Sequence, residues 1–281
     1  MGQHHRAAGA FHSAHEAGGL TMTALASEES TLIPRTHERR VAVVTGASGG
    51  LGRAICRGLA AAGATVVGVD LMAADDTAAD TRAAGGEWLG IVADVTSPED
   101  THDVADRVVA TYGRCDILVN NAGVADICGW DELSYELWQQ VLRVNLDGQF
   151  LMAKALVPAM REHGYGRIVN ISSTSVAMPV DNFIAYRVSK MGVIGLTRAL
   201  ASLGADGITA NAVSPSLTPT GMTDGRVPDE VFEMIRQGQN IKRIARPDDL
   251  VPTILFLTGE GSYWVTGQAF AADGGGSFNL P

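Results

Sequence analysis

The sequence predicts an α/β protein built on a doubly wound parallel sheet. Short apolar runs rich in β-branched residues recur along the chain, beginning at residues 41–44, and helical patterns separate them. Strands that alternate with helices through a whole chain pair in parallel, with helices on both faces of the sheet. The length of 281 residues suits one large domain of this class. We therefore expect seven parallel strands between two layers of helices.

The first predicted strand, residues 41–44, leads into a glycine-rich turn and then a helical pattern. Glycine lets a backbone approach a pyrophosphate closely, and a helix N-terminus offers free N–H groups to it. The spacing is G-x3-G-x-G rather than the G-x-G-x-x-G fingerprint, so an ordinary strand-to-helix turn is the alternative. The predicted dinucleotide contacts in this turn are Gly46, Ser48, Gly50, Leu51 and Gly52.

The second predicted strand, residues 65–70, ends in Asp70. A carboxylate roughly 20 residues after the glycine turn is expected to bind the adenosine ribose hydroxyls of NAD and to repel the extra phosphate of NADP. Leu71 and Met72 follow it, instead of an Arg or Lys that would attract that phosphate. We predict NAD as the cofactor, with contacts from Asp70 and Leu71. A surface carboxylate that caps the next helix is the alternative.

Small and amide-bearing residues follow the third and fourth predicted strands, residues 88–93 and 116–119. Open α/β sheets bind ligands at the carboxyl ends of their strands, where such residues leave room and offer hydrogen bonds. The predicted cofactor contacts here are Asp94, Val95, Asn121, Ala122 and Gly123.

Tyr186 and Lys190 stand four positions apart, which places them on one face of a helix. A free tyrosine hydroxyl has a pKa of about 10, and a neighbouring cation lowers that pKa. The pair is a candidate general acid/base. A solvated helix face is the alternative when the pair is considered alone.

With these segments assembled, the chain resembles the short-chain dehydrogenase/reductase family, in its single-domain, NAD-dependent form with a Rossmann fold. The resemblance runs from about residue 40 to residue 275. It rests on mutually spaced motifs: the glycine turn, Asp94, the run Asn120-Asn121-Ala122-Gly123, Asn145, Ser173, Tyr186 with Lys190, Pro215 with Thr220, Thr266-Gly267-Gln268 and Asp273-Gly274-Gly275.

The resemblance implies a catalytic tetrad of Asn145, Ser173, Tyr186 and Lys190. Asn145 would bend its helix locally and hold a water that feeds protons towards Lys190, although a satisfied core amide is its alternative. Ser173 would bind the substrate oxygen and Tyr186 would be the acid/base. Lys190 would lower the pKa of Tyr186 and bind the nicotinamide ribose. The remaining implied cofactor contacts are Tyr186 and Lys190 themselves with Pro215, Ser216, Thr218 and Thr220.

Three features depart from the family pattern. Ser216 replaces the usual glycine after Pro215 and lacks the φ freedom of glycine. Thr218 stands where the family usually has Ile or Val. The stretch 199–207 is one residue shorter than usual, which should end the Tyr186 helix early.

Several stretches resemble phenylethanol-dehydrogenase-like enzymes, which implies a secondary alcohol or ketone substrate with an aryl or alicyclic group. The implied substrate contacts are Ser173, Ser175, Val180, Phe183, Tyr186 and Met222, with Trp130 as a further apolar candidate. Plain core packing is the alternative for the apolar members of this set. Two other functions stay open: a 3-oxoacyl-thioester reductase that uses NADPH, and a non-catalytic NAD(H)-binding sensor.

Composition narrows the class of protein. The formal net charge of −10 argues against nucleic-acid binding, which needs a basic face. The sequence has no apolar run long enough for a membrane span. The three cysteines, Cys56, Cys115 and Cys128, have no metal-like spacing, so we predict reduced thiols, no metal and a cytoplasmic protein.

The N-terminal segment and the middle of the chain predict the domain organisation. Residues 1–39 are rich in Gly, Ala, Ser and His, and we predict a flexible extension before a domain spanning residues 40–281. A substrate lid is expected near residues 218–240. Family resemblance implies a homotetramer formed through the predicted helices 134–163 and 185–204. Their apolar positions exceed the needs of one internal face: Leu137, Val141, Phe150, Met191, Ile194 and Leu196.

Overall fold

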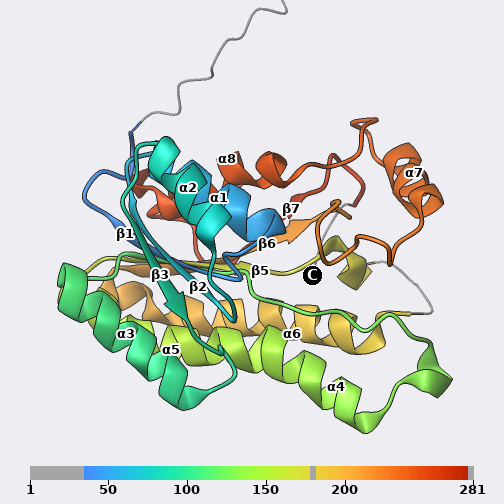
Figure 1. The fold of residues 1–281 in the computed structure, drawn as a ribbon, viewed down its shortest axis with the longest axis horizontal. Helices are drawn as coiled ribbons and strands as arrows, with labels where there is room; N and C mark the ends of the chain where they lie inside the picture. The colour runs from blue at the N-terminus through green and yellow to red at the C-terminus, as the bar shows by residue number, and fades with distance from the viewer. Residues whose placement is uncertain (1–34, 178–181, 278–281) are drawn as a thin grey trace, which may run out of the picture. The chain divides into compact units, whose positions relative to one another are not determined.

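A sheet of seven parallel strands lies at the centre of the fold, as predicted (Figure 1). The computed structural model describes residues 35–177 and 182–277. The described residues belong to one compact unit, which lies within residues 33–281 and contains the sheet. The strand order is β3-β2-β1-β4-β5-β6-β7. The strands are β1 Val41–Thr45, β2 Thr65–Asp70, β3 Trp88–Val92, β4 Ile117–Asn120, β5 Gly166–Ile171, β6 Ile208–Pro215 and β7 Ala269–Ala272.

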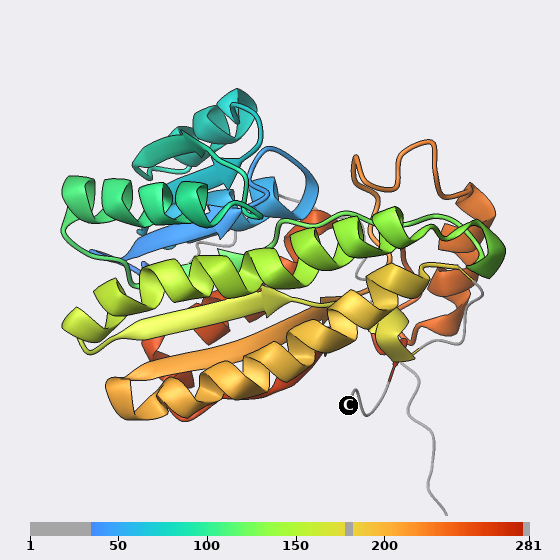
Figure 2. The same ribbon diagram turned by 90° about the horizontal axis from the view of Figure 1, so that it is seen from below.

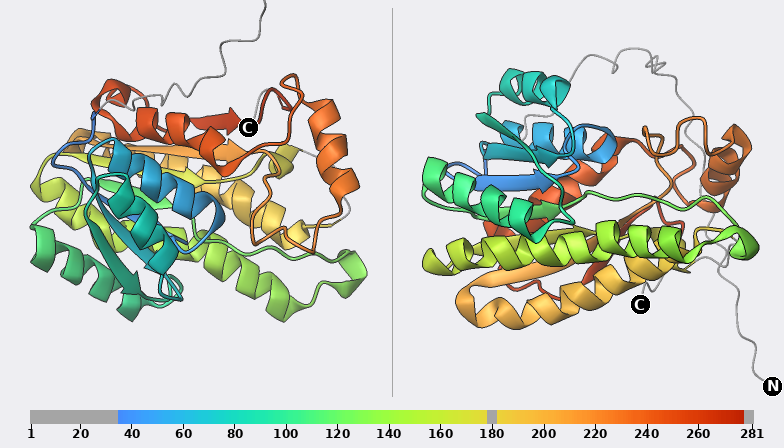
Figure 3. Two further views of the ribbon diagram at one scale, coloured as in Figure 1. Left: turned by 45° about the horizontal axis from the view of Figure 1, so that its top comes forward. Right: turned by 60° about the horizontal axis from the view of Figure 1, so that its bottom comes forward.

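Helices cover both faces of the sheet. One face carries α1 (Gly50–Ala61), α2 (Asp75–Ala83) and α8 (Val251–Thr258) (Figure 1). The other carries α3 (Pro98–Tyr112), α5 (Gly148–Glu162) and α6 (Ile184–Leu200), which run side by side in Figure 2. Two further helices, α4 (Tyr135–Leu142) and α7 (Asp229–Gly238), lie beyond the carboxyl ends of the strands (Figures 1 and 3).

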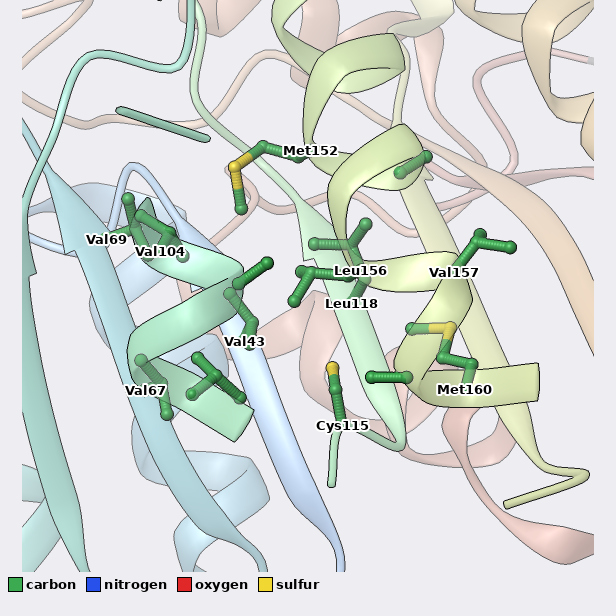
Figure 4. Close-up of a cluster of buried hydrophobic side chains, with 14 of the residues drawn as sticks. Val43, Val67, Val69, Val104, Cys115, Leu118, Met152, Leu156, Val157 and Met160 are labelled. Carbon is green, nitrogen blue, oxygen red and sulfur yellow. The ribbon is translucent and has the colours of Figure 1, made fainter. Parts of the chain in front are cut away.

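Alternate side chains of each strand enter opposite cores. In β1, Val41 and Val43 join the cluster beneath α3 and α5, whereas Ala42 and Val44 join the cluster beneath α1 and α8. Figure 4 shows the first cluster, in which Val43 and Leu118 of the sheet lie near Leu156 of α5. Burial on both faces explains why these strands are continuous apolar runs rather than alternating ones.

The strand order reverses between β1 and β4, and this reversal positions the site. The chain leaves β1 towards β2 on one side and leaves β4 towards β5 on the other. The loops that follow β1 and β4 therefore diverge and leave a crevice at the carboxyl edge of the sheet, where ligands of this class of fold bind.

The folded unit begins earlier than the predicted boundary at residue 40. His37 is 1% exposed, and its Nε2 lies 2.8 Å from the hydroxyl of Thr258 at the end of α8. Burial, with Arg40 nearby, lowers the pKa of His37 to about 4. Arg40 in turn pairs with the buried carboxylate of Asp116. Residues 35–39 contain no apolar residue that would mark them as part of the fold, and these distant contacts reveal that they belong to it. Residues 1–34 lie outside the described part of the chain.

Neither of the two long helices predicted in the middle region, residues 134–163 and 185–204, is one continuous α-helix. The first is interrupted: α4 begins after Ser134, whose hydroxyl accepts from Leu137 N, and a π-helix at Arg143–Asp147 separates it from α5. The second helix, α6, ends at Leu200 and the chain continues as a 3-10 helix at Ala201–Asp206. The early end agrees with the shortened stretch in the sequence. None of the described helices combines the length and the apolar character that crossing a bilayer requires.

Gly68 offers a test of packing in the sheet. A Cβ built on Gly68 would lie 2.0 Å from the indole ring of Trp88, a residue of the neighbouring strand β3. We expect Gly68→Ala to displace this ring and to lower the free energy of unfolding by roughly 1–3 kcal/mol. Urea denaturation followed by far-UV circular dichroism measures the change. The control is Gly129→Ala, because Gly129 has a φ of −78° and nothing lies within 4 Å of its built Cβ. Equal stability of the two variants would contradict the prediction.

Candidate active site

The glycine turn between β1 and α1 has the shape of a phosphate cradle. Gly46 and Gly50 adopt left-handed φ values of 65° and 51°. A Cβ on Gly52 would lie 2.0 Å from the carbonyl oxygen of Gly46, so only glycine fits there. The turn leads directly into the N-terminus of α1, whose cap residue Gly49 has no side chain to occupy the N–H groups. Leu51 is half-buried and packs on the core beneath α1. These features fit a dinucleotide pyrophosphate.

Asn121 fastens the glycine turn to the loop after β4. Its Nδ2 donates to the carbonyl oxygens of Thr45 and Gly46, at 2.9 and 3.0 Å. The hydroxyl of Thr45 accepts in return from the backbone N–H groups of Asn121 and Ala122, both at 3.0 Å. These four hydrogen bonds hold the glycine turn and the loop after β4 against each other at the border of the crevice.

Asp70 ends β2 beside the same turn. Its carboxylate accepts from the backbone N–H of Ser48 at 2.9 Å, so the predicted ribose-binding acid lies next to the predicted phosphate-binding loop. Leu71, the next residue, is largely exposed, as a side chain that covers a ligand from outside would be. No basic residue immediately follows Asp70 in the chain.

Asp94 and Val95 have different surroundings. The Asp94 carboxylate accepts from Thr96 N at 2.8 Å, while its own backbone N–H donates to Asp100. The side chain of Val95 turns into the core and would contact a Cβ on Gly148 at 2.9 Å. Only the backbone of Val95 is therefore available for the predicted cofactor contact.

Asn145 lies in the π-helix between α4 and α5, where the sequence predicted a local bend. Its Oδ1 accepts from Val124 N at 2.8 Å, and its Nδ2 donates to Val124 O and to the hydroxyl of Ser189, both at 2.9 Å. Ser189 then donates to the carbonyl of Tyr186. The Asn145 side chain thus joins the loop after β4 to α6. Both N–H donors of its amide are therefore used, whereas its Oδ1 accepts one hydrogen bond.

Tyr186 lies in the first turn of α6 and forms a hydrogen bond with Ser173, which follows β5. Burial raises the pKa of Tyr186, and the bond to Ser173 opposes this rise. The sequence predicted a lowered pKa caused by Lys190. This prediction is wrong for the cofactor-free protein, because desolvation of the phenol dominates.

Lys190 is almost fully buried, at 3% exposure. Its Nζ lies 5.6 Å from the centre of the Tyr186 ring and donates to Ile171 O at 2.8 Å. Burial lowers the pKa of Lys190 to about 8. A Cβ built on Gly123 would lie 3.5 Å from this ammonium and 3.2 Å from Asn145 Oδ1. Gly123 therefore keeps open the space between two members of the predicted tetrad.

The loop after β6 covers the crevice from the other side. Pro215 ends the strand, and its carbonyl accepts from Thr174. Thr220 lies against the glycine turn, since a Cβ on Gly50 would meet it at 2.9 Å. The hydroxyl of Thr218 is buried and donates to Ser216 O at 2.9 Å, so it is used within the loop rather than facing a cofactor.

Ser216, the departure from the usual glycine, has a structural role. The described non-glycine residues with positive φ are Arg39 and Phe183, so serine is not strained at position 216. Its hydroxyl donates to Gln239 Oε1 at 2.8 Å, and Gln239 Nε2 donates to the carbonyls of Ile241 and Arg243. This buried amide anchors the end of the predicted lid to the loop after β6.

The predicted substrate contacts other than Ser173 and Tyr186 differ in where they lie. Ser175 is hydrogen-bonded to Ser173 at 2.9 Å, and the ring of Phe183 lies 6.2 Å from that of Tyr186, so both belong to the site. Met222 is 37% exposed in the segment predicted as a lid, and the cavity of about 660 Å³ between this segment and α7 is lined by its neighbours Gly221 and Thr223 rather than by Met222 itself. Val180 lies outside the described residues. Trp130 is 75% exposed, so its side chain mostly faces solvent.

The sequence gave no sign of three residues that organise the site. Asp126 accepts from the first N–H groups of α6, and Gln239 anchors the lid. Gln149 is buried beside Lys190 and donates weakly to the same carbonyl, Ile171 O, at 3.4 Å. Each acts on a partner distant in sequence, so no local motif marks it.

One family model covers most of the chain. The family model described as enoyl-(acyl carrier protein) reductase matches residues 46–277. The chain belongs to the short-chain dehydrogenase/reductase family, which consists of oxidoreductases that bind a nicotinamide cofactor.

Named relatives share most of the chain. D-Threitol dehydrogenase of Mycolicibacterium smegmatis is 37% identical over 243 residues, covering 84% of this chain and 92% of that protein. Cis-4-hydroxycyclohexanecarboxylate dehydrogenase of Sinomonas cyclohexanicum is 39% identical over 239 residues, covering 84% and 96%. The 3-oxoacyl-[acyl-carrier-protein] reductase of a Synechocystis strain is 36% identical over 241 residues, with the same coverage of 84% and 96%.

Solved structures share the fold. Levodione reductase is 29% identical and superposes with a TM-score of 0.80, covering 85% of this chain and 97% of that one. A candidate NAD(P)-dependent gluconate 5-dehydrogenase of Beutenbergia cavernae is 39% identical, with a TM-score of 0.81 and coverage of 86% and 98%; it holds NADP at low occupancy.

Burial of Lys190 predicts how stability depends on pH. The folded-state pKa of about 8 lies below the ordinary value of 10.5, so the burial penalty is complete below pH 8 and is relieved as the pH rises towards 10.5. We expect Lys190→Met to raise the free energy of unfolding at neutral pH, by about 3 kcal/mol at most. The advantage should shrink at about pH 10, where the wild-type amine folds largely uncharged.

Urea titrations of the cofactor-free protein at both pH values measure this difference. The matched control is Lys154→Met, because Lys154 is exposed on α5 and carries no such penalty. A difference between wild type and Lys190→Met that stays constant with pH would contradict the prediction.

Proposed function

We propose that this protein is an NAD-dependent dehydrogenase that interconverts secondary alcohols and ketones. The observation that carries the proposal is the position of Tyr186. Tyr186 is hydrogen-bonded to Ser173, and the centre of its ring lies 5.6 Å from the Nζ of Lys190. It lies at the same edge of the sheet as the glycine cradle. A proton-transfer group beside a dinucleotide site is the arrangement that carbonyl reduction requires.

Tyr186 and Ser173 have different roles in the proposed reaction. When bound, the nicotinamide supplies the carbon that gives or takes hydride. Tyr186 gives its phenolic proton to the carbonyl oxygen in reduction and takes the hydroxyl proton in oxidation. Ser173 donates a hydrogen bond to the same oxygen and stabilises the charge that develops there in the transition state. Because burial raises the pKa of Tyr186, the phenol is protonated at neutral pH and ready for reduction, and alkaline pH favours oxidation.

Asp70 supports NAD as the cofactor. Its carboxylate already lies against the N–H of Ser48 in the glycine turn, where it can accept from ribose hydroxyls. A second phosphate at that ribose would meet this negative charge with no basic residue adjacent in sequence. The gluconate dehydrogenase-like structure holds NADP, so cofactor choice varies among similar folds and depends on this local chemistry.

The lid supports a neutral alcohol rather than an acyl-carrier substrate. Within residues 218–240 four carboxylates, Asp224, Asp229, Glu230 and Glu233, outnumber two cations, Arg226 and Arg236, and Arg236 is paired with Glu233. An acidic lid repels a phosphopantetheine arm and an acidic carrier protein. The relative named for cis-4-hydroxycyclohexanecarboxylate supports the alicyclic ring of the proposed substrate but not its neutrality, because that compound carries a carboxylate. The similarity to D-threitol dehydrogenase extends the proposal to neutral polyols.

We also expect a homotetramer in the cytoplasm. Phe150 of α5 and Met191 of α6 are exposed apolar side chains on the helices that family members pair. Two of the positions that the sequence suggested for this surface, Val141 and Ile194, are instead buried in the core of the chain itself. The remaining apolar face is smaller than the sequence predicted, but it lies on the expected helices.

Tyr186→Phe tests the proposed chemistry. Removing the proton-transfer group should reduce kcat with secondary alcohols by at least about 100- to 10,000-fold and leave NADH binding unchanged. Steady-state kinetics and NADH fluorescence titration measure the two quantities. Tyr135→Phe is the control, because Tyr135 is exposed on α4. Substantial turnover by Tyr186→Phe would overturn the assignment, and a wild type that binds NADH without turning over any alcohol would favour the sensor.

A further inference from the structure

Asp126 is a buried carboxylate that the tetrad does not include. It lies three residues after Gly123 in the loop that follows β4, and it is 1% exposed. Its two oxygens accept from two consecutive backbone N–H groups: Oδ1 from Tyr186 at 2.8 Å and Oδ2 from Ala185 at 3.2 Å. The carboxylate therefore reaches across 60 positions of sequence to hold the backbone of the proposed acid/base residue itself.

The start of α6 needs this contact because it lacks a cap of its own. The residue at the N-cap position is Phe183, which has no hydrogen-bonding side chain and adopts a left-handed conformation with a φ of 61° and a ψ of 36°. Helices normally begin with Ser, Thr, Asp or Asn, whose oxygen accepts from the first free N–H groups. Left-handed backbone is unfavourable for a bulky residue such as phenylalanine. Asp126 supplies the missing acceptor from another loop and places a negative charge at the positive end of the helix.

The same contact fixes two aromatic side chains of the site. The first turn of α6 carries Tyr186, and the residue before the helix carries the Phe183 ring, which meets the Tyr186 ring edge-on at 6.2 Å. On its other side, Tyr186 is held through its carbonyl by Ser189, which Asn145 holds in turn. Asp126 thus binds the N–H of Tyr186 directly, and Asn145 reaches the C=O of Tyr186 through Ser189.

We propose that Asp126 is the positioning residue that sets Tyr186 for proton transfer. This inference rests on the proposed role of Tyr186 as the acid/base. Asp126 acts through the backbone and touches neither substrate nor cofactor. Its loss lets the first turn of α6 fray and moves the phenol relative to Ser173, while the glycine cradle after β1 stays intact.

Two variants and one control test the proposal. Asp126→Ala removes both acceptors, so kcat with a secondary alcohol should fall about 10- to 100-fold, as misplacement of a reacting group does. The stoichiometry and affinity of NADH binding should stay at the wild-type values. Asp126→Asn keeps an oxygen for Tyr186 N and should recover most of kcat. The control is Asp131→Ala, because Asp131 lies exposed five residues further along the same loop.

Amide hydrogen exchange reports the contact directly. The N–H groups of Ala185 and Tyr186 should exchange slowly in the wild type and rapidly in Asp126→Ala, with the rest of α6 still protected. In Asp126→Asn only the Ala185 N–H should exchange faster, because the new amide group faces it with a donor. This isosteric variant decides the question even where the alanine variant does not fold.

Three results would overturn the inference: wild-type kcat in Asp126→Ala, a parallel loss of NADH-binding sites and kcat, or unchanged protection of Ala185 in Asp126→Asn. Failure of the proposed function looks different. In that case the wild type itself turns over no alcohol, and the exchange experiment still reports whether Asp126 holds the helix.

Discussion

Burial of the Lys190 ammonium is the constraint around which the rest of the site is arranged. A buried cation destabilises the fold unless acceptors surround it, and here the carbonyl of Ile171 at the end of β5 supplies one. A side chain at Gly123 would crowd this region, because a Cβ there would lie 3.5 Å from the ammonium and 3.2 Å from Asn145 Oδ1. A charge that costs stability in the cofactor-free protein is retained where it faces a proton-transfer group, which is the usual compromise at a functional site.

The topology brings the parts of the site together, and a few polar side chains then fix their positions. The reversal of strand order places the loops after β1 and β4 at one crevice, and Asn121 with Thr45 joins them. Asn145 and Asp126 then tie the segments after β4 to α6. Each tie joins segments that are distant in sequence. The geometry around Tyr186 therefore depends on the whole sheet being formed.

Sequence patterns predicted what local chemistry determines. The strands follow from apolar runs, the glycine turn from close backbone approach, and the bend near Asn145 from a family motif that the π-helix matches. They could not predict the burial of His37, because its partner Thr258 lies at the far end of the chain. The direction of the Tyr186 pKa shift was wrong for the same reason, since desolvation depends on the assembled neighbours. The roles of Asp126 and Gln239 were not predicted, because an isolated Asp or Gln in a loop carries no periodic or motif signal.

The most direct test of the account is the reduction of NAD and of NADP by the wild-type enzyme, at alkaline pH, with a panel of alcohols. The panel contains 1-phenylethanol, cyclohexanol, threitol and a 3-hydroxyacyl thioester. The account predicts turnover with NAD on the neutral secondary alcohols, because Asp70 excludes the extra phosphate and the lid is acidic. Turnover confined to NADP and the thioester would contradict it and would assign the site to acyl-thioester reduction.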